Sequence, residues 1–398
     1  MKLALILENS SEYGRRMAEG IADYARSLRT IRLAWYNPET LSPGETFAGV
    51  DGIIARITSD AMARRLARTG LPVANVFFQK DYPDFFGVMP DQEAIGKLAA
   101  EHFLEKWHKN FAFVGFRDVA FSTMRRDGFL AELGRSGRTA AVNELALTGD
   151  MRAFFNADLS PVAELRELQD WLAGLPRPVA VFAANDLLAL NLLHLAAGAG
   201  IGVPDDMAIL GVDDDKLICA FADVPLSSID QNARGVGYAA ARMLVAAIKA
   251  APDRKRHRAW RVAPAGLVER ASSGRHAIQP EWLADVLGFI DANLDRPLST
   301  ADLVKFAGRS HVTISKAFAA KLGVSPVRYI TERKMNSAQR MLAGGDLLVK
   351  EVALRVGYTS FARFSAIYKG FFARSPRADI RAARRETTAE PRLTPAGS

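Results

Sequence analysis

The amino-acid sequence predicts a two-lobed α/β domain with parallel, doubly wound sheets, followed by an all-α domain that carries two helix-turn-helix motifs. Short apolar runs alternate with helical patterns as far as Ser272, and beyond Glu281 the pattern is helical alone. Regular alternation of strands and helices is typical of doubly wound α/β folds. The chain of 398 residues also exceeds the ~100–200 residues of a common single domain, so two or three domains are expected.

The strands of the first domain are predicted from short runs rich in β-branched and aromatic residues, the pattern of strands buried on both faces. These runs are KLALIL, IRLAWY, GIIARI, PVANVFF, NFAFVGF, PVAVFAAN and DMAILGVDD. Apolar residues at helical spacing predict helices over 13–28, 92–107, 122–133, 162–172 and 186–197. In such folds ligands bind outside the carboxyl ends of the parallel strands.

A second α/β unit of similar size begins near 97–113, which predicts two lobes with a cleft between them. Later, VPLSSIDQNARGVGYAAARMLVAAI predicts a short extended piece and an amphipathic helix, and WRVAPAGLVERAS predicts one last strand. The segment SSGRHAIQP has the composition of a linker. We therefore expect a ligand-binding domain over 1–271, a linker over 272–281, a helical domain over 282–385 and a disordered tail over 386–398.

The helical domain contains one arrangement twice. Ser299, with Asp302 three residues later, predicts a capped helix that ends at Gly308, and Ser310 precedes the helix HVTISKAFAAKLG. A long helix, VRYITERKMNSAQRMLAGG, leads to a short helix over 347–355, a turn at Gly357 and a last helix over 361–372. Two such motifs on a rigid spacer would place two recognition helices in major grooves about 34 Å apart, one turn of DNA.

Basic residues concentrate at the second motif, where the acidic residue between 361 and 385 is Asp379. This is the electrostatic footprint of phosphate binding, and it agrees in sign with the formal net charge of +8 and the isoelectric point near 9.6. The alternative is a solvated helical bundle with a basic face. The basic residues are Arg363, Lys369, Arg374, Arg377, Arg381, Arg384 and Arg385.

Residues 298–381 resemble the AraC-type DNA-binding domain through LSTADLVKFAGRSHVTISKAFAAKLGVSPVRYI and EVALRVGYTSFARFSAIYKGFFARSPRADIR. The resemblance implies that double-stranded operator or promoter DNA is a partner, and it places base contacts on both recognition helices. Ala373 stands where the family usually has Gly, and alanines at base-facing positions offer only thymine-methyl contacts. The candidate DNA-binding residues are His311, Val312, Thr313, Ser315, Lys316, Ala362, Arg363, Ser365, Ala366 and Lys369.

Residues 2–270 resemble the LacI/GalR-type, periplasmic-binding-protein-like ligand domain through VMPDQEAIGKLAAEHFLEKWHKNFAFVGF, VFAANDLLALNLLHLAAGAGIGVPDDMAILGVDDD and VPLSSIDQNARGVGYAAARML. That family normally carries its helix-turn-helix at the N-terminus, whereas here the first strand starts at once. A sensor placed before an AraC-type domain is similar to the xylose operon regulators. The resemblance implies a homodimeric regulator of sugar catabolism genes that binds a monosaccharide, xylose by suggestion, and an activator would also contact RNA polymerase. A different small ligand, or repression, is the alternative.

Polar side chains at the strand ends supply the candidate sugar site. Asp213 follows the strand MAILGV and Asn185 follows PVAVFAA, so both project into the cleft, where a sugar needs planar donors and acceptors. The resemblance adds four ligand-binding candidates, which are Arg125, Tyr13, Asp91 and Gln231. Stacking candidates are Trp35, Phe78 and Phe121. The alternative functions are helix capping for the strand-end residues and core packing for the aromatics.

Other patterns exclude functions. GAGIG follows a helix and precedes a strand, the reverse of a phosphate-binding loop, so neither a nucleotide nor any other cofactor is expected. The carboxylates of Asp213, Asp214 and Asp215 lack EF-hand spacing, the histidines lack metal-ligand spacing, and Cys219 has no nucleophile signature, so neither a metal site nor an enzyme is expected. A single cysteine, no export signal and no membrane span favour a cytoplasmic protein over a transport solute-binding protein.

Overall fold

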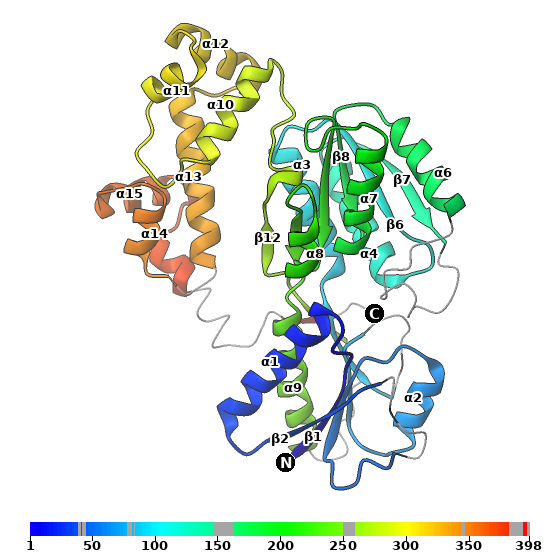
Figure 1. The fold of residues 1–398 in the computed structure, drawn as a ribbon. Helices are drawn as coiled ribbons and strands as arrows, with labels where there is room; N and C mark the ends of the chain where they lie inside the picture. Colours follow the sequence, from blue (N-terminus) through cyan, green and yellow to red (C-terminus); the bar gives the residue numbers. More distant parts are fainter. Residues whose placement is uncertain are drawn as a thin grey trace. The chain divides into compact units, whose positions relative to one another are not determined.

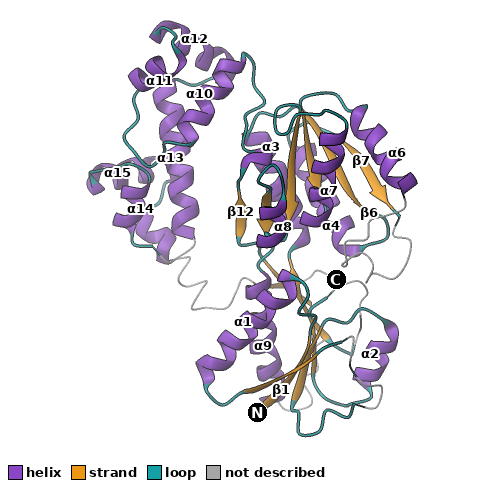
Figure 2. Cartoon of the chain, in the orientation of Figure 1, coloured by secondary structure: helices purple, strands orange, loops and turns teal. Residues whose placement is uncertain are grey.

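The computed structural model describes residues 1–38, 41, 45–77, 82, 84–146, 162–249, 259–343, 347–381 and 393–395. The chain divides into two compact units (Figures 1 and 2). One contains Met1–Gly274 together with Pro391–Ser398, and the other contains Arg275–Glu390. The predicted fold class, α/β lobes followed by a helical domain, is confirmed.

The first lobe is built on a seven-stranded sheet in the order β13-β11-β5-β4-β3-β1-β2. All its pairings are parallel except that between β11 and β13. Its strands are β1 (Lys2–Ile6), β2 (Arg32–Tyr36), β3 (Gly52–Ala55), β4 (Val73–Asn75), β5 (Phe86–Pro90), β11 (Ala259–Val262) and β13 (Leu393–Pro395). Its helices are α1 (Glu12–Leu28), α2 (Asp60–Ala67) and α9 (Ala233–Lys249).

The second lobe is built on a six-stranded sheet in the order β12-β10-β9-β8-β6-β7, parallel except between β10 and β12. Its strands are β6 (Asn110–Phe116), β7 (Ala140–Leu145), β8 (Val179–Ala183), β9 (Met207–Val212), β10 (Ser227–Asp230) and β12 (Gly266–Val268). Its helices are α3 (Gln92–Glu105), α4 (Ala120–Arg135), α6 (Val162–Ala173), α7 (Asp186–Gly198), α8 (Lys216–Phe221) and the 3-10 turn η2 (Ala271–Ser273).

Three segments carry the chain between the lobes, and they are hydrogen-bonded to one another. They lie between β5 and α3, between β10 and α9, and between β11 and β12. The Asp91 amide donates to Val262 O at 2.8 Å, and the Ala265 amide donates to Asp230 O at 2.9 Å. The side-chain amide of Asn232 donates to Ala263 O at 3.0 Å. The predicted single last strand is therefore wrong, because WRVAPAGLV pairs with one sheet, crosses, and then pairs with the other.

Glycines allow the helices at the cleft to pack unusually closely. A Cβ at Gly96 of α3 would lie 2.0 Å from Arg125 O of α4, and one at Gly128 would lie 2.2 Å from Glu93 O. No side chain fits at those distances, so both positions require Gly. The contact brings the start of α3 against the middle of α4, which places Gln92 and Arg125 side by side.

The helical unit contains α10 (Glu281–Asp291), α11 (Thr300–Ala307), α12 (His311–Leu322), α13 (Pro326–Ala343), α14 (Val349–Arg355) and α15 (Phe361–Phe372). Ser299 and Asp302 form the predicted capping box of α11, and Gly308 ends that helix with a φ of 59°. Met335, Ala338 and Leu342 of α13 pack in one core with residues of α14 and α15. Figure 1 shows both of these helices beside α13. The long helix is thus the element on which the second motif is assembled.

Two stretches near the predicted boundaries have defined structure. Ser272 and Ser273, at the start of the predicted linker, are buried, and Ser272 Oγ donates to Ile209 O at 2.7 Å. The tail over 386–398 was predicted to be disordered, but Leu393–Pro395 within it forms strand β13, which pairs with β11. The rest of that tail, including Arg384 and Arg385, lies outside the described residues.

Candidate functional site

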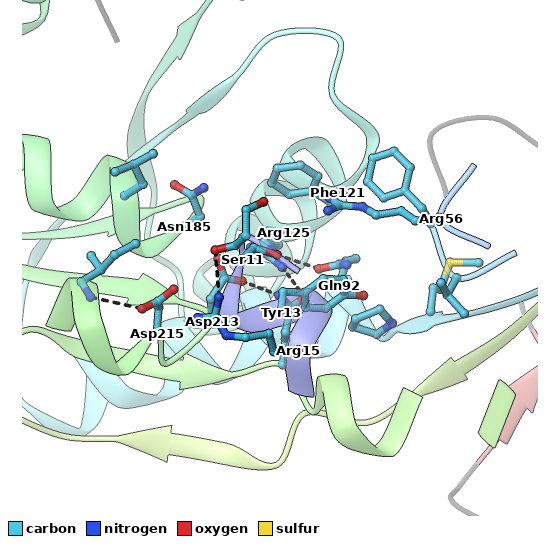
Figure 3. A pocket seen from close by; sticks show the side chains of 18 of the residues that line it. Ser11, Tyr13, Arg15, Arg56, Gln92, Phe121, Arg125, Asn185, Asp213 and Asp215 are labelled. Atoms are coloured by element: carbon cyan, nitrogen blue, oxygen red, sulfur yellow. Dashed lines mark hydrogen bonds between the residues drawn. The ribbon is translucent and has the colours of Figure 1, made fainter. Parts of the chain in front are cut away.

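A cavity of about 300 Å³ opens between the two lobes, at the carboxyl ends of their strands (Figure 3). This volume suits a ligand of monosaccharide size, and a concave site with a few convergent polar groups is the usual form of a small-molecule site. The first lobe contributes Ser10, Ser11, Tyr13, Arg15, Arg56, Val76, Phe77, Met89 and Pro90. The second lobe and the crossing segments contribute Gln92, Phe121, Met124, Arg125, Asn185, Leu187, Asp213, Asp215, Leu217, Ile218 and Gln231.

Arg125 lies at the centre of a polar network beside this cavity. Its Nε donates to Gln92 Oε1 at 2.7 Å and its Nη2 to Gln231 Oε1 at 2.9 Å, while Nη1 donates to the carbonyl of Ala184. The side chain is 2% exposed, and burial lowers the pKa of its guanidinium. The ring of Phe121 lies 5.0 Å from the guanidinium carbon. Three structural segments therefore fix one cation in a single orientation, with its remaining N–H groups available to a ligand.

Asp213 completes the network. The amide of Gln231 donates to the Asp213 carboxylate, so Gln231 joins Arg125 to Asp213. The residue follows β9 with a φ of 122°, in the region that favours glycine, and it lines the cavity. Burial raises the pKa of Asp213 to about 7, although the positive charges of Arg125 and Arg56 act in the opposite direction. Its charge therefore depends on conditions close to neutrality.

The two predicted helix-cap positions behave differently. Asn185 Oδ1 accepts from the Leu188 amide at 2.9 Å and so caps α7, yet the residue also lines the cavity, where its NH₂ group can donate. Asp91 caps α3 by accepting from the Ala94 amide at 3.1 Å, and it is not among the residues that line the cavity. Its neighbour Gln92 lines the cavity and contacts Arg125 instead.

The first lobe supplies a second arginine that the sequence analysis missed. Arg56 follows β3, is 8% exposed and pairs with the carboxylate of Glu8. Its guanidinium carbon lies 4.6 Å from the ring centre of Phe77 and 5.6 Å from that of Tyr13, the cavity-lining tyrosine predicted from the sequence. Arg56 follows the observed strand β3, but it stands inside the run GIIARI that was predicted as a strand, so it was not recognised as a strand-end residue.

Of the predicted stacking residues, Phe121 lines the cavity. Trp35 is 43% exposed and its indole N–H donates to Leu7 O at 3.0 Å, outside the cavity. Phe78 lies outside the described residues.

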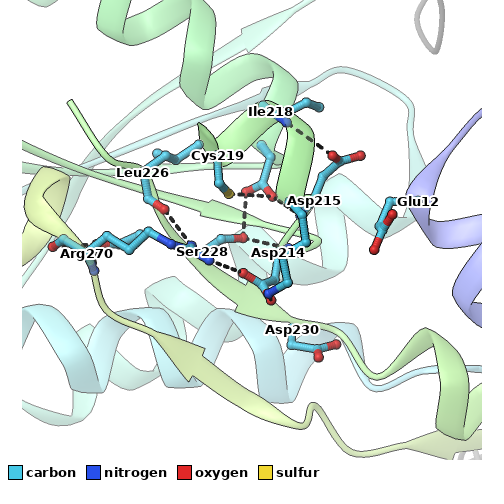
Figure 4. Close-up of polar contacts among 12 residues, drawn as sticks. Glu12, Asp214, Asp215, Ile218, Cys219, Leu226, Ser228, Asp230 and Arg270 are labelled. Carbon is cyan, nitrogen blue, oxygen red and sulfur yellow. Dashed lines mark hydrogen bonds and ion pairs between the residues drawn. The ribbon is translucent and has the colours of Figure 1, made fainter. Parts of the chain in front are cut away.

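The carboxylates next to Asp213 have structural partners (Figure 4). Asp214 pairs with Arg270 at 2.7 Å and with Lys216, and although burial acts against it, these bonds hold the pKa of Asp214 below its usual range. Asp186 is fully buried and accepts from Ser228 Oγ at 2.6 Å and from the Asp215 amide at 2.9 Å, and burial raises its pKa well above the usual range. No group of metal-ligating side chains is found among the described residues.

The helical unit presents the two predicted recognition helices as structural repeats. In α12, Ile314 and Phe318 face inward, and in α15 Phe364 and Tyr368 do so, each 50 positions later. Ser310 accepts from the Thr313 amide at 3.1 Å and Ser360 from the Arg363 amide at 3.3 Å, so the same cap begins both helices.

The candidate DNA-binding residues occupy equivalent faces of the two helices. Ser315 and Ser365 are half-buried. The others, His311, Val312, Thr313, Lys316, Ala362, Arg363, Ala366 and Lys369, are exposed. Each helix thus exposes its candidate base-contacting side chains to solvent, while its apolar face packs against the rest of the unit. A helix that contacts base edges in the major groove requires this arrangement.

Comparisons with known proteins agree with this geometry. A periplasmic binding protein-like domain is matched at residues 100–273 and a helix-turn-helix domain at 303–382. The xylose operon regulatory protein of Haemophilus influenzae is 24% identical over 385 residues, which cover 94% of this chain and 97% of that protein. The protein of the same name from Escherichia coli K12 is 22% identical, with 94% and 96% covered. The structure of the xylose-binding transcription activator xylR has the same fold, with a TM-score of 0.59, 21% identity and 96% and 98% covered.

The chain is an AraC-type transcription regulator with a periplasmic binding protein-like sensor. The expectation of a regulator rather than an enzyme is confirmed, because these relatives are transcription regulators. The regulator has, over its described residues, no helix with the length and apolar character needed to cross a membrane.

Proposed function

We propose that the regulator binds a neutral monosaccharide, xylose or a related sugar, in the cavity between the lobes and activates sugar catabolism genes. The observation that carries this proposal is the fixed series Gln92–Arg125–Gln231–Asp213 along one wall of a 300 Å³ cavity. A carboxylate accepts two vicinal hydroxyls and a guanidinium donates to a third oxygen, which is the pattern a polyol requires.

The charges around the cavity favour a neutral ligand over an anionic one. Arg56 pairs with Glu8, and Arg15 pairs with Glu12 at 3.2 Å, so both first-lobe cations already have carboxylate partners. Arg125 faces Asp213 through Gln231. A sugar that contacts Tyr13 and Arg56 on one lobe and Asp213, Arg125 and Asn185 on the other stabilises the closed arrangement, because only that arrangement makes both sets of contacts.

Gene control follows from the second unit. Each protomer places α12 and α15 in successive major grooves, with affinity from phosphate contacts and specificity from the exposed residues of the two helices. The regulator acts in the cytoplasm as a homodimer and, as an activator, contacts RNA polymerase. The xylR protein whose fold it shares is itself described as xylose-binding and as an activator. We retain the domain limits 1–271, 272–281 and 282–385 as part of the proposal.

The test has two arms. In isothermal titration of the full chain with a panel of pentoses and hexoses, one sugar should bind saturably. Arg125→Met and Asp213→Ala should each lower the affinity for that sugar about tenfold or more, since each change leaves sugar hydroxyls and a buried partner unpaired. Trp35→Phe, outside the cavity, is the matched control and should leave affinity unchanged. The sugar site would be refuted if no sugar in the panel gave heat of binding, or if both variants bound the sugar as tightly as the wild type.

The second arm measures the affinity of the full chain for DNA. The full chain is used to select duplexes from a random-sequence library, and binding is measured as a function of salt. A regulator enriches two sequence blocks one helical turn apart and shows a steep loss of affinity with salt. If the sugar weakens binding to the selected duplex, and transcription from that duplex rises when the chain is absent, the chain is a repressor instead.

A further inference from the structure

Lys334, in the middle of the long helix α13, has its ammonium group in the interior of the helical unit. The residue is 4% exposed. Its Nζ donates to three backbone carbonyl oxygens, Leu294 O at 3.0 Å, Arg296 O at 2.7 Å and Val356 O at 2.8 Å. An ammonium has three N–H donors, so its hydrogen-bonding capacity is fully used by main-chain atoms.

Those three carbonyls belong to different halves of the unit. Leu294 and Arg296 lie in the segment between α10 and α11, which leads into the first helix-turn-helix motif. Val356 follows α14 and begins the turn of the second motif. Lys334 itself is on the helix that joins the two motifs, so one side chain ties the entry to the first motif, the spacer and the turn of the second.

The backbone at this junction is packed as closely as the hydrogen bonds suggest. Gly357 has a φ of 70°, and a Cβ there would lie 2.5 Å from Arg296 O and 2.5 Å from Lys334 Nζ. The centre of the Tyr358 ring lies 5.5 Å from the same Nζ. The turn of the second motif therefore packs closely against both the segment before the first motif and the Lys334 ammonium.

The ammonium supplies one donor for each of the three carbonyls. Apolar side chains would leave three carbonyls without their donor, and an unpaired buried polar group is costly. Burial lowers the pKa of Lys334 to about 8, opposed by the charge of Asp295 and assisted by that of Arg296. Beside this junction, Arg333 donates to Asp291 at 2.8 Å, and burial raises the pKa of Tyr358.

We propose that Lys334 is a positioning residue that sets the separation and orientation of the two recognition helices, so that one protomer engages two grooves at once. The inference rests on the proposed DNA-binding function. Without the ammonium each motif keeps its apolar core, which includes the buried Ile314 and Phe318 of α12 and the buried Phe364 and Tyr368 of α15. The two recognition helices are then no longer held in the relative position that two grooves require. Binding of the second groove therefore gains less from binding of the first.

The experiment compares two duplexes, using the full chain. One is a duplex selected by the wild-type chain, with two blocks one turn apart, and the other has one block scrambled. Lys334→Met should reduce the ratio of two-block to one-block affinity about tenfold or more and make the salt dependence of two-block binding shallower, since fewer phosphates are contacted together. Lys334→Arg should restore most of the ratio. The matched control Lys305→Met, which removes an exposed charge from α11, should change both affinities together.

A second readout is the pH dependence of the same affinity ratio. Raising the pH from 7 to 9 should lower the wild-type ratio, because a neutral amine has two N–H donors for three carbonyls, whereas the ratio of Lys334→Arg should stay constant. An unchanged ratio in folded Lys334→Met, together with a flat pH profile of the wild type, would overturn the inference while leaving the regulator intact. If the wild-type chain selects no duplex at all, the proposed function itself fails.

Discussion

Arg270 and Asp214 form a hydrogen-bonded ion pair, with Nη2 2.7 Å from Oδ1, where the sensor chain approaches its last residues (Figure 4). Asp214 is 2% exposed and immediately follows the cavity residue Asp213. Arg270 also donates to Leu226 O at 2.7 Å, and it precedes η2. One side chain thus links the loop that follows the cavity residue Asp213 to the segment through which the sensor leaves for the helical unit.

Arg270→Gln should destabilise the sensor by about 2–3 kcal/mol. The change leaves the buried Asp214 carboxylate with Lys216, whose side chain is 60% exposed and therefore a weaker partner. Thermal unfolding followed by calorimetry measures the effect. Lys216→Gln, which removes the exposed partner, should cost well under half as much, and equal losses in the two variants would contradict the ranking.

The pH dependence of the sensor should reflect Asp213. Its pKa in the folded chain, about 7, lies above the ordinary value of 3.8, so the folded state holds the proton more firmly than the unfolded state. The free energy of unfolding contributed by this group is therefore full below pH 4 and is lost as pH rises through 7. The ligand-free sensor of the wild type should lose more stability between pH 5 and 8 than Asp213→Asn, as measured by its melting temperature.

Sugar affinity should change in the opposite direction over the same range, because the ionised carboxylate accepts hydroxyls better than the protonated acid. Titration calorimetry at pH 5.5 and pH 8 should show tighter binding at the higher pH. The same affinity at both values would place the ligand away from Asp213.

Ala373 ends α15 in the left-handed conformation, with a φ of 54°, where Gly323 ends α12 with a φ of 70°. A Cβ in this conformation costs about 1–2 kcal/mol, and glycine recovers part of that after its greater freedom in the unfolded chain is counted. Ala373→Gly should stabilise the helical unit by about 0.5–1 kcal/mol in thermal unfolding. Gly323→Ala is the reciprocal variant and should destabilise it by a similar amount.

The closing helical turn of the second motif depends on a buried hydroxyl. Tyr368, fully buried, donates to the carboxylate of Asp379, which also pairs with Arg374 at 2.7 Å. Tyr368→Phe should destabilise the helical unit by about 1.5–3 kcal/mol, because a 7% exposed carboxylate loses a donor. Denaturant unfolding measures this. Asp379→Asn changes the acceptor of the same hydrogen bond. Wild-type stability in both variants would show that the bond does not contribute to stability.

Local rules explain what was predictable from the sequence. Apolar runs and helical spacing predicted most strands and helices, while β5, β7, β13, α2 and α8 were missed, since these are short or polar segments whose pattern is weak. Asp213 and Asn185 could be placed at the cavity because parallel strands present their carboxyl ends on one edge. The duplicated motif was visible because its caps and apolar positions depend on residues only a few positions apart.

Tertiary structure decided the rest, because it joins residues that no short pattern connects. Arg125 meets Gln231 across 106 positions, and Arg270 meets Asp214 across 56. The choice of Gln92 over Asp91 depended on which side of one helix turn faces the cavity. The burial of Lys334 required two motifs to fold against one helix. Sequence alone determined the elements and their polar ends, whereas the partner of each buried charge was fixed only when distant segments packed together and excluded water.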